Sequence, residues 1–196
     1  KKLFEIGSAY GFFLDLVKHD FDTVGGIDVT EAGVRFAREA MGLNVAQGDF
    51  LDHKLADNID VACMWDTIEH LRSPHLYLKK ISENMDTGGV VAITTGDIAS
   101  VPARMRGQRW RLIHPPTHAH YFSPESLKHM LANYRFEVLY NRYCGFYRST
   151  ETIAYVILVL RQQRPKLFDR FKRSGLLNFD LYLNFYDIMY AIARKV

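Results

Sequence analysis

The sequence predicts an α/β fold in which a mostly parallel β-sheet carries helices on both faces. Short apolar segments alternate with segments whose apolar residues recur at helical spacing, which indicates strands joined by helices. Residues 59–65 (I-D-V-A-C-M-W) form a nearly continuous apolar run, as expected of a central parallel strand covered on both faces. A glycine turn follows the first predicted strand, and such a turn is typical of a ligand-binding corner in these sheets.

Length and composition fit one domain over residues 1–196. The hydrophobic fraction of 48% excludes a disordered chain, and the net charge of +3 is too small to indicate nucleic-acid binding by itself. Cys63 and Cys144 stand alone, so we interpret them as reduced, buried thiols of a cytoplasmic protein. No signal peptide or membrane-length apolar run is visible, and because the chain begins inside a strand we expect a segment before Lys1.

The first strand and its turn predict a binding site. Leu3–Ile6 is apolar apart from Glu5, and the chain then turns at Gly7 and reaches Gly11 before a helical segment from Phe12 to Val17. Such a corner gathers backbone N–H groups and a positive helix end, and Glu5 adds a carboxylate. A plain strand–turn–helix corner with glycines needed only for geometry is the alternative.

Acidic residues end the first three predicted strands. Asp28 follows the strand Thr23–Ile27, at the spacing from the glycine turn where a carboxylate accepts hydrogen bonds from ribose hydroxyls. Asp49 lies in a G-D-F segment after the strand Asn44–Gln47. A helix cap for Asp28 and a simple turn for Asp49 are the alternatives. Three carboxylates at neighbouring strand ends predict a polar, nucleoside-like ligand.

The remaining elements have ordinary sequence signals. Helices are predicted to begin at Thr30, Ser73-Pro74 and Ser123-Pro124, which suit the N-cap and first helical positions, and Gly42 ends the first of these helices. Alternating apolar residues predict a half-exposed strand late in the chain. The full set comprises helices over Glu31–Met41, Pro74–Met85, Pro124–Asn133 and Thr152–Leu160, and strands over Val90–Thr94, Phe136–Tyr143 and Asp187–Ala193.

Taken together, these motifs resemble the class I S-adenosylmethionine-dependent methyltransferases. Their first motif, acidic-x-G-x-G-x-G, is matched by Glu5, Gly7 and Gly11, with Ala9 in place of the middle glycine. W-D-T-I-E-H-L at 65–71 and H-A-H-Y-F-S-P-E-S-L-K at 118–128 are also typical, and the likeness runs from Lys2 to Lys195. The resemblance implies a Rossmann-like sheet of seven strands with one antiparallel strand. It is strongest to bacterial small-molecule enzymes, including those acting on quinone precursors or sugars.

The resemblance also implies the site. S-adenosylmethionine, converted to S-adenosylhomocysteine, would be held by Glu5, Gly7, Ser8, Ala9, Gly11, Asp28, Val29, Asp49, Phe50 and Trp65. Asp49 would accept from the adenine amine, and Phe50 would cover the ring. His118 and His70 are the candidate catalytic residues, and His120 is an alternative base, because histidine titrates near neutral pH. Loop backbone contacts for these histidines are the competing interpretation.

A metal ion is a further possibility at the 66–70 turn. Related segments bind a divalent ion in ubiquinone-pathway O-methyltransferases and small-RNA 2′-O-methyltransferases, so Glu69 and His70 could polarise an acceptor hydroxyl. The alternative is that they cap the helix and order the loop, and we expect no metal.

The loop at 98–120 contains four arginines (Arg104, Arg106, Arg109 and Arg111), which either bind an anionic substrate or are solvated. Pro165–Asn178 is basic and aromatic, and we expect the helical insertion at about 150–180 that contains it to be a lid or a homodimer surface.

The function expected is methyl transfer to a small molecule, with oxygen favoured as the acceptor atom, and without nucleic acid or a membrane span. Three alternatives remain: an NAD-dependent oxidoreductase, a catalytically silent S-adenosylmethionine-binding module and an RNA methyltransferase.

Overall fold

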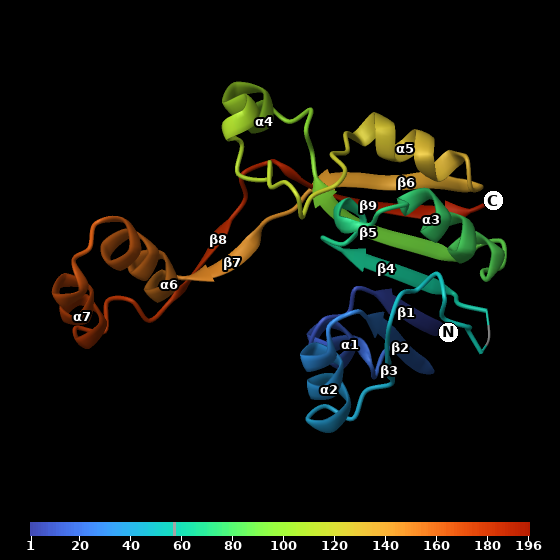
Figure 1. The fold of residues 1–196 in the computed structure, drawn as a ribbon, viewed down its shortest axis with the longest axis horizontal. Helices are drawn as coiled ribbons and strands as arrows, with labels where there is room; N and C mark the ends of the chain where they lie inside the picture. The colour runs from blue at the N-terminus through green and yellow to red at the C-terminus, as the bar shows by residue number, and fades with distance from the viewer. Residues whose placement is uncertain (57) are drawn as a thin grey trace. The chain divides into compact units, whose positions relative to one another are not determined.

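The computed structural model describes residues 1–56 and 58–196, which divide into two compact units. The first comprises Lys1–Arg142 with Asp187–Val196, and the second is Tyr143–Tyr186. The first unit is built on a seven-stranded sheet, and the second on a two-stranded one (Figure 1). The predicted insertion at 150–180 lies within the second unit.

The large sheet has the strand order β3-β2-β1-β4-β5-β9-β6. The pairs β1–β2, β2–β3, β1–β4 and β4–β5 are parallel, whereas β9 is antiparallel to β5. This confirms the predicted mostly parallel sheet with one reversed strand. The strands are β1 (Lys2–Ile6), β2 (Thr23–Asp28), β3 (Val45–Gln47), β4 (Val61–Trp65), β5 (Val90–Gly96), β6 (Phe136–Tyr143) and β9 (Ile188–Lys195).

Helices cover both faces of this sheet. Successive side chains along a strand point to opposite faces, so the apolar side chains of the strands form one core on each face. Leu3 of β1 lies in one core with Leu14 and Val34, whereas Phe4 lies in the other with Leu78 and Leu127. The first core is supplied by α1 (Phe12–Val17) and α2 (Glu31–Glu39), and the second by α3 (Pro74–Glu83) and α5 (Pro124–Ala132).

The helix starts agree with the sequence signals, with one difference in their hydrogen bonds. Ser123 caps α5 by accepting from the Ser126 amide, and Ser73 precedes α3 with Pro74 in its first turn. Thr30 occupies the N-cap position of α2, but its hydroxyl donates to Asp28 Oδ1 at 2.6 Å. Neither cysteine forms a disulfide, and Cys63 is buried in the core as predicted, whereas Cys144 is only of intermediate exposure.

Residues 98–120 contain short helices that the sequence analysis did not predict. They are α4 (Val101–Arg106) and η2 (Gly107–Arg109), and Ser100 Oγ caps α4 by accepting from the Ala103 amide. A six-residue helix spans fewer than two turns, so it cannot show an apolar stripe in the sequence.

The second unit is a hairpin that carries helices at its end. Strands β7 (Phe146–Ser149) and β8 (Asp180–Leu183) pair antiparallel, and neither was predicted. Between them lie α6 (Thr150–Ala154), the π-helix η3 (Tyr155–Arg161) and α7 (Pro165–Arg173). The predicted helix Thr152–Leu160 is therefore partly π-helical. Among the residues described, no helix is both long and apolar enough to cross a membrane.

Asp187 anchors the loop at 98–120. It was predicted to begin the last strand, but β9 begins at Ile188, and the Asp187 side chain is buried. Its Oδ2 accepts hydrogen bonds from Trp110 Nε1 at 2.9 Å and Arg111 Nε at 3.0 Å, and its Oδ1 accepts from Arg111 Nη2 at 2.7 Å. Arg111 is thus held in an ion pair within the protein.

We expect Asp187→Ala to lower the free energy of unfolding by about 2 kcal/mol, because the buried indole N–H of Trp110 loses its acceptor and the partly exposed Arg111 guanidinium loses this ion pair. Urea denaturation followed by circular dichroism measures this loss. Glu137→Ala is the matched control, since its pair with Arg194 is exposed on both sides and should cost about 0–1 kcal/mol. Equal losses in the two variants would contradict the anchoring role.

Candidate functional site

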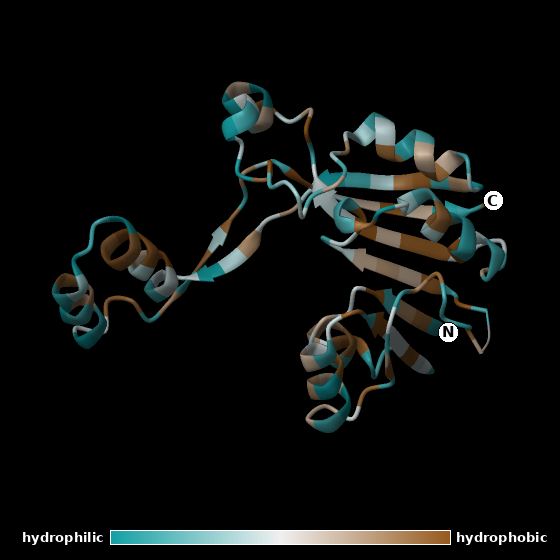
Figure 2. Ribbon diagram, in the orientation of Figure 1, coloured by the Kyte–Doolittle hydropathy of each residue, from teal (hydrophilic) through white to brown (hydrophobic). Residues whose placement is uncertain are grey.

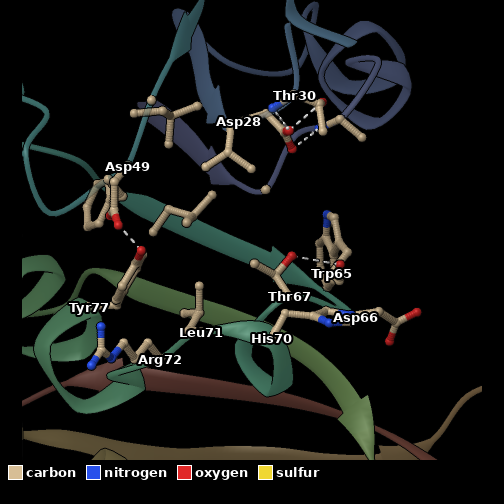
Figure 3. A pocket seen from close by; sticks show the side chains of 17 residues that line it. Asp28, Thr30, Asp49, Trp65, Asp66, Thr67, His70, Leu71, Arg72 and Tyr77 are labelled. Atoms are coloured by element: carbon tan, nitrogen blue, oxygen red, sulfur yellow. Dashed lines mark hydrogen bonds between the residues drawn. The ribbon is translucent and has the colours of Figure 1, made fainter. Parts of the chain in front are cut away.

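A cavity of about 540 Å³ lies at the carboxyl ends of β1, β2 and β4 (Figure 3). This is the point where the chain, having moved outward from β1 to β3, returns to place β4 on the other side of β1. Ligands bind at such switch points in open α/β sheets, and the volume is that of a drug-sized ligand. The wall is formed by Ile6, Gly7, Ala9, Ile27, Asp28, Val29, Thr30, Gly48, Asp49, Phe50, Trp65, Asp66, Thr67, His70, Leu71, Arg72 and Tyr77.

The glycine turn is fixed by close packing. Gly7 has a φ of 80°, and a Cβ placed there would lie 2.5 Å from Thr67 Oγ1. The amides of Gly7 and Ser8 donate to the Ile27 carbonyl, and the Ala9 amide donates to Asp28 Oδ2 at 2.7 Å. These amides are therefore occupied within the chain. Glycine is required because the turn and the 66–70 segment approach each other closely.

Asp28 and Asp49 both line the cavity, and each is held by its own neighbours (Figure 3). In addition to the Ala9 contact, Asp28 Oδ1 accepts from the Thr30 amide at 2.8 Å and from its hydroxyl. Asp49 Oδ1 accepts from the Leu51 amide at 2.8 Å and the Tyr77 hydroxyl at 2.5 Å. Both carboxylates are thus fixed in place beside the cavity.

Phe50 is almost fully buried. The centroids of its ring and the Tyr77 ring are 5.8 Å apart, and Lys80 Nζ lies 5.0 Å from the centroid of the Phe50 ring. Tyr77, like Thr67 and Arg72, lines the cavity but was not singled out in the sequence. Tyr77 and Arg72 belong to α3 and the segment before it, where apolar periodicity alone indicates a core-facing helix. No motif distinguished them.

The predicted cofactor residues are therefore gathered at one place, although not all reach the cavity wall. Gly7, Ala9, Asp28, Val29, Asp49, Phe50 and Trp65 line it. Glu5, Ser8 and Gly11 are not among the lining residues. All three are buried beside or within the glycine turn, and Gly11 forms the N-cap of α1. The binding role of each residue remains a prediction.

The two candidate catalytic histidines lie together. The rings of His70 and His118 are 4.7 Å apart and meet edge to face. His70 Nδ1 lies 2.8 Å from the Thr117 carbonyl oxygen, and His118 Nδ1 lies 2.8 Å from that of Leu112. Since a carbonyl can only accept, Nδ1 carries the proton in both rings. This leaves Nε2 of each ring available for another partner.

Backbone hydrogen bonds bring these two histidines together. The Glu69 carbonyl accepts from the amides of both Ala119 and His120, at 2.9 and 3.1 Å. Burial lowers the pKa of His118 below its usual value, and the nearby His70 and His114 act in the same direction. His118 is therefore neutral near pH 7. His120, the alternative base, has only a long contact from Nε2 to the Arg72 carbonyl, at 3.4 Å.

Glu69 adds a buried carboxyl group to this pair. Its Oε2 accepts from Thr95 Oγ1 at 2.9 Å, and burial raises its pKa. One possible ligand atom from each of Glu69, His70 and His118 lies within 4.8 Å of the others, so the group could hold a divalent ion. Asp66, at the start of the same 66–70 turn, is exposed and does not belong to this group. The expectation of a metal-free site remains a prediction.

Residues 1–141 match the family model described as a methyltransferase domain, which covers more than half of the chain. The chain belongs to this methyltransferase family. S-adenosylmethionine is the cofactor of the methyltransferase, and the family assignment argues against the NAD-dependent alternative. The sequence resemblance and the Rossmann-like fold are thereby confirmed.

Solved structures share the fold of this methyltransferase. An S-adenosylmethionine-dependent methyltransferase from Thermotoga maritima has a TM-score of 0.64 and 19% identity over 100% of this chain and 82% of that one. A second, from Archaeoglobus fulgidus, has a TM-score of 0.65 and 19% identity over 100% of this chain and 86% of that one. Magnesium protoporphyrin IX methyltransferase from Synechocystis, with bound S-adenosylhomocysteine, has a TM-score of 0.62 and 13% identity over 99% of this chain and 74% of that one. No curated protein sequence matches the chain.

Polar atoms around the glycine turn fit the amino-acid part of the cofactor. Glu5 Oε2, Ser8 Oγ and Trp65 Nε1 are buried and have no hydrogen-bond partner among the described residues. Buried polar atoms are normally paired, so a ligand that supplies partners is expected here. A carboxyl oxygen can accept from an ammonium group, and an indole N–H and a hydroxyl can donate to a carboxylate. The three orphaned atoms therefore suit an α-amino acid.

Glu5 is the basis of a stability prediction. Burial, together with the nearby Asp28 carboxylate, raises the pKa of Glu5 to about 8. Between its ordinary pKa and this value, the folded chain keeps a proton that the unfolded chain has lost, so stability falls as the pH rises. The slope approaches about 1.4 kcal/mol per pH unit.

We expect Glu5→Gln to remove this slope, so that the variant loses less stability than the wild type from pH 5 to pH 8. Urea denaturation of the cofactor-free protein at several pH values measures it. Glu83→Gln, an exposed residue of α3, is the control and should retain the wild-type slope. The same slope in Glu5→Gln and the wild type would contradict the buried, protonated state.

Proposed function

We propose that this methyltransferase methylates a hydroxyl oxygen of a small-molecule acceptor. The observation that supports this best is the His70–His118 pair, in which each imidazole uses Nδ1 for a backbone carbonyl and keeps Nε2 available for an acceptor. His70 lines the cavity itself. A hydroxyl group must lose a proton when it is methylated, and a positioned histidine accelerates such a step by about 10²–10⁴-fold.

The bound cofactor supplies an electrophilic methyl group on a sulfonium centre. The chain's own part is to position the acceptor and to receive its proton. His118 Nε2 takes the hydroxyl proton, while the Leu112 carbonyl holds the opposite nitrogen and stabilises the imidazolium that forms. His70, at 4.7 Å, limits the orientations open to the His118 ring. A carbon acceptor would need a group that stabilises a carbanion, which these loops do not offer.

Charge supports a small acceptor over a nucleic acid. The whole chain has a net charge of +3, but residues 143–186 alone carry +4. The unit that contains the cavity therefore has a net charge of −1. Nucleic-acid binding relies on a basic surface along the phosphate backbone, so this unit is poorly suited to it. A role of the insertion at 150–180 as a lid or homodimer surface also remains a proposal.

Transfer of a deuterated methyl group from S-adenosylmethionine into small metabolites of a cell extract tests the proposal. Mass spectrometry should identify labelled methyl ethers or esters, and their formation should require the protein. Labelled amines or carbon-methylated products would contradict oxygen as the acceptor, and label in a nuclease-sensitive fraction would indicate RNA. A catalytically silent module would bind S-adenosylmethionine in calorimetry and yield no labelled product.

A further inference from the structure

The 143–186 unit exposes its apolar side chains instead of burying them. Among its described residues, Phe168 is the one large apolar side chain that is buried, where its ring packs against Tyr155 at 5.4 Å. More than half of the large apolar side chains exposed in the described chain belong to this unit of 44 residues. The most exposed are Tyr147, Leu160, Leu176, Phe179, Tyr182 and Tyr186. Apolar surface of this extent marks an interaction site.

The same unit is strongly basic. It contains seven Lys and Arg residues and three Asp and Glu residues, whereas the rest of the chain is slightly acidic. The basic side chains at 161, 164, 166, 170, 172 and 173 are exposed and follow directly after the apolar segment at 155–160. In Figure 2 the helical segment α6–η3 is largely hydrophobic, whereas α7 is mostly hydrophilic.

We propose that the 143–186 unit binds the surface of an anionic lipid bilayer. Segments that lie in a membrane interface combine exposed apolar and aromatic side chains with Lys and Arg, and bind more tightly to anionic lipids. Tyrosine suits this interface because its ring is apolar and its hydroxyl can remain hydrated. The apolar side chains would enter the acyl boundary, and the basic side chains would meet headgroup phosphates. The unit lies outside residues 1–141, which match the methyltransferase family.

Charge and chemistry favour a bilayer over two other partners. A second copy would bring a unit of the same +4 charge against this one, so its approach is opposed by electrostatic repulsion. RNA would also attract the basic residues, but it is bound through phosphate contacts and stacking on planar groups. The exposed aliphatic side chains of Val156, Ile157 and Leu160 cannot stack in this way, whereas lipid chains accommodate them.

Co-sedimentation of the full chain with lipid vesicles tests the proposal. We expect binding to phosphatidylcholine–phosphatidylglycerol vesicles that weakens with salt, and little binding to phosphatidylcholine alone. Lys166→Gln/Arg170→Gln should weaken the partition coefficient by about 25-fold, since each basic residue near an anionic membrane contributes about fivefold. Leu160→Ser should weaken it by about tenfold through lost apolar burial.

Matched controls lie on the other unit. Arg35→Gln/Lys128→Gln removes the same charge from exposed positions on α2 and α5, and Leu16→Ser replaces a leucine that is 78% exposed. These variants should bind vesicles as the wild type does, and unchanged binding of S-adenosylmethionine verifies folding in every variant. The proposal is overturned if the wild type binds neither vesicle or both equally, or if the controls lose as much affinity. It is also overturned if Leu160→Ser instead dissolves a dimer seen in sedimentation equilibrium, or if Lys166→Gln/Arg170→Gln weakens binding of RNA but not of anionic vesicles.

Discussion

Gly7→Ala is expected to abolish measurable binding of S-adenosylmethionine and to lower the free energy of unfolding by about 2–4 kcal/mol. Alanine is disfavoured at a φ of 80°, and its Cβ would lie 2.5 Å from Thr67 Oγ1 and 2.8 Å from Thr67 Cγ2. The clash pushes the turn away from the 66–70 segment, and both sides of that contact line the cavity. Isothermal calorimetry and urea denaturation measure the two effects.

Gly88→Ala separates backbone strain from the clash. Gly88 has a φ of 93°, but a Cβ there would meet nothing within 4 Å. We expect a loss of only about 1 kcal/mol and unchanged cofactor affinity. Trimming the neighbour in Gly7→Ala/Thr67→Ala should restore part of the lost stability, because contacting residues show non-additive effects. If Gly7→Ala and Gly88→Ala lose the same stability and the same cofactor affinity, packing against Thr67 does not fix the shape of the cofactor site.

His118→Ala is expected to lower kcat by about 10²–10⁴-fold while leaving the Kd for S-adenosylmethionine unchanged, since the histidine acts on the acceptor's proton. The pH profile gives a second readout. The base must be unprotonated, so activity is present above its pKa and is lost as the pH falls through that pKa. Burial and the neighbouring His70 lower the pKa of His118, so the acidic limb should lie below pH 6.5.

His70→Ala should move this limb upward, because the pKa of His118 is no longer lowered by repulsion from the charged form of His70. The labelled-methyl assay with a confirmed acceptor, run from pH 5 to pH 9, measures both effects. His129→Ala, on the exposed face of α5, should show neither the loss of kcat nor the shift. An acidic limb that persists unchanged in His118→Ala would assign the proton to another group.

The sheet and the cofactor side of the site could be predicted from the sequence because their signals are local. The glycine turn, the apolar run at 59–65 and the acidic strand ends each lie within a few residues of the element they specify. The structure adds what these groups contact. Asp28, for example, holds the Ala9 amide and Thr30, which the spacing of its strand could not indicate.

The acceptor side could be predicted only as separate candidates. His70 and His118 were named, but their contact depends on the path of the 47-residue connection between them, which contains α3, β5 and α4. The anchoring of Trp110 and Arg111 on Asp187 joins residues more than 70 positions apart. Strands β7 and β8, at four residues each, are too short to show alternation clearly.

The double hydrogen bond from residues 119 and 120 to the Glu69 carbonyl has a consequence for how acceptor preference can change. Both partners are peptide groups, so every amino acid except proline at these two positions supplies the same tether. Side chains along the loop can therefore be exchanged without detaching it from the turn at residues 68–70. Backbone groups thus hold the loop in position, while its side chains are free to change and could adapt the site to new substrates.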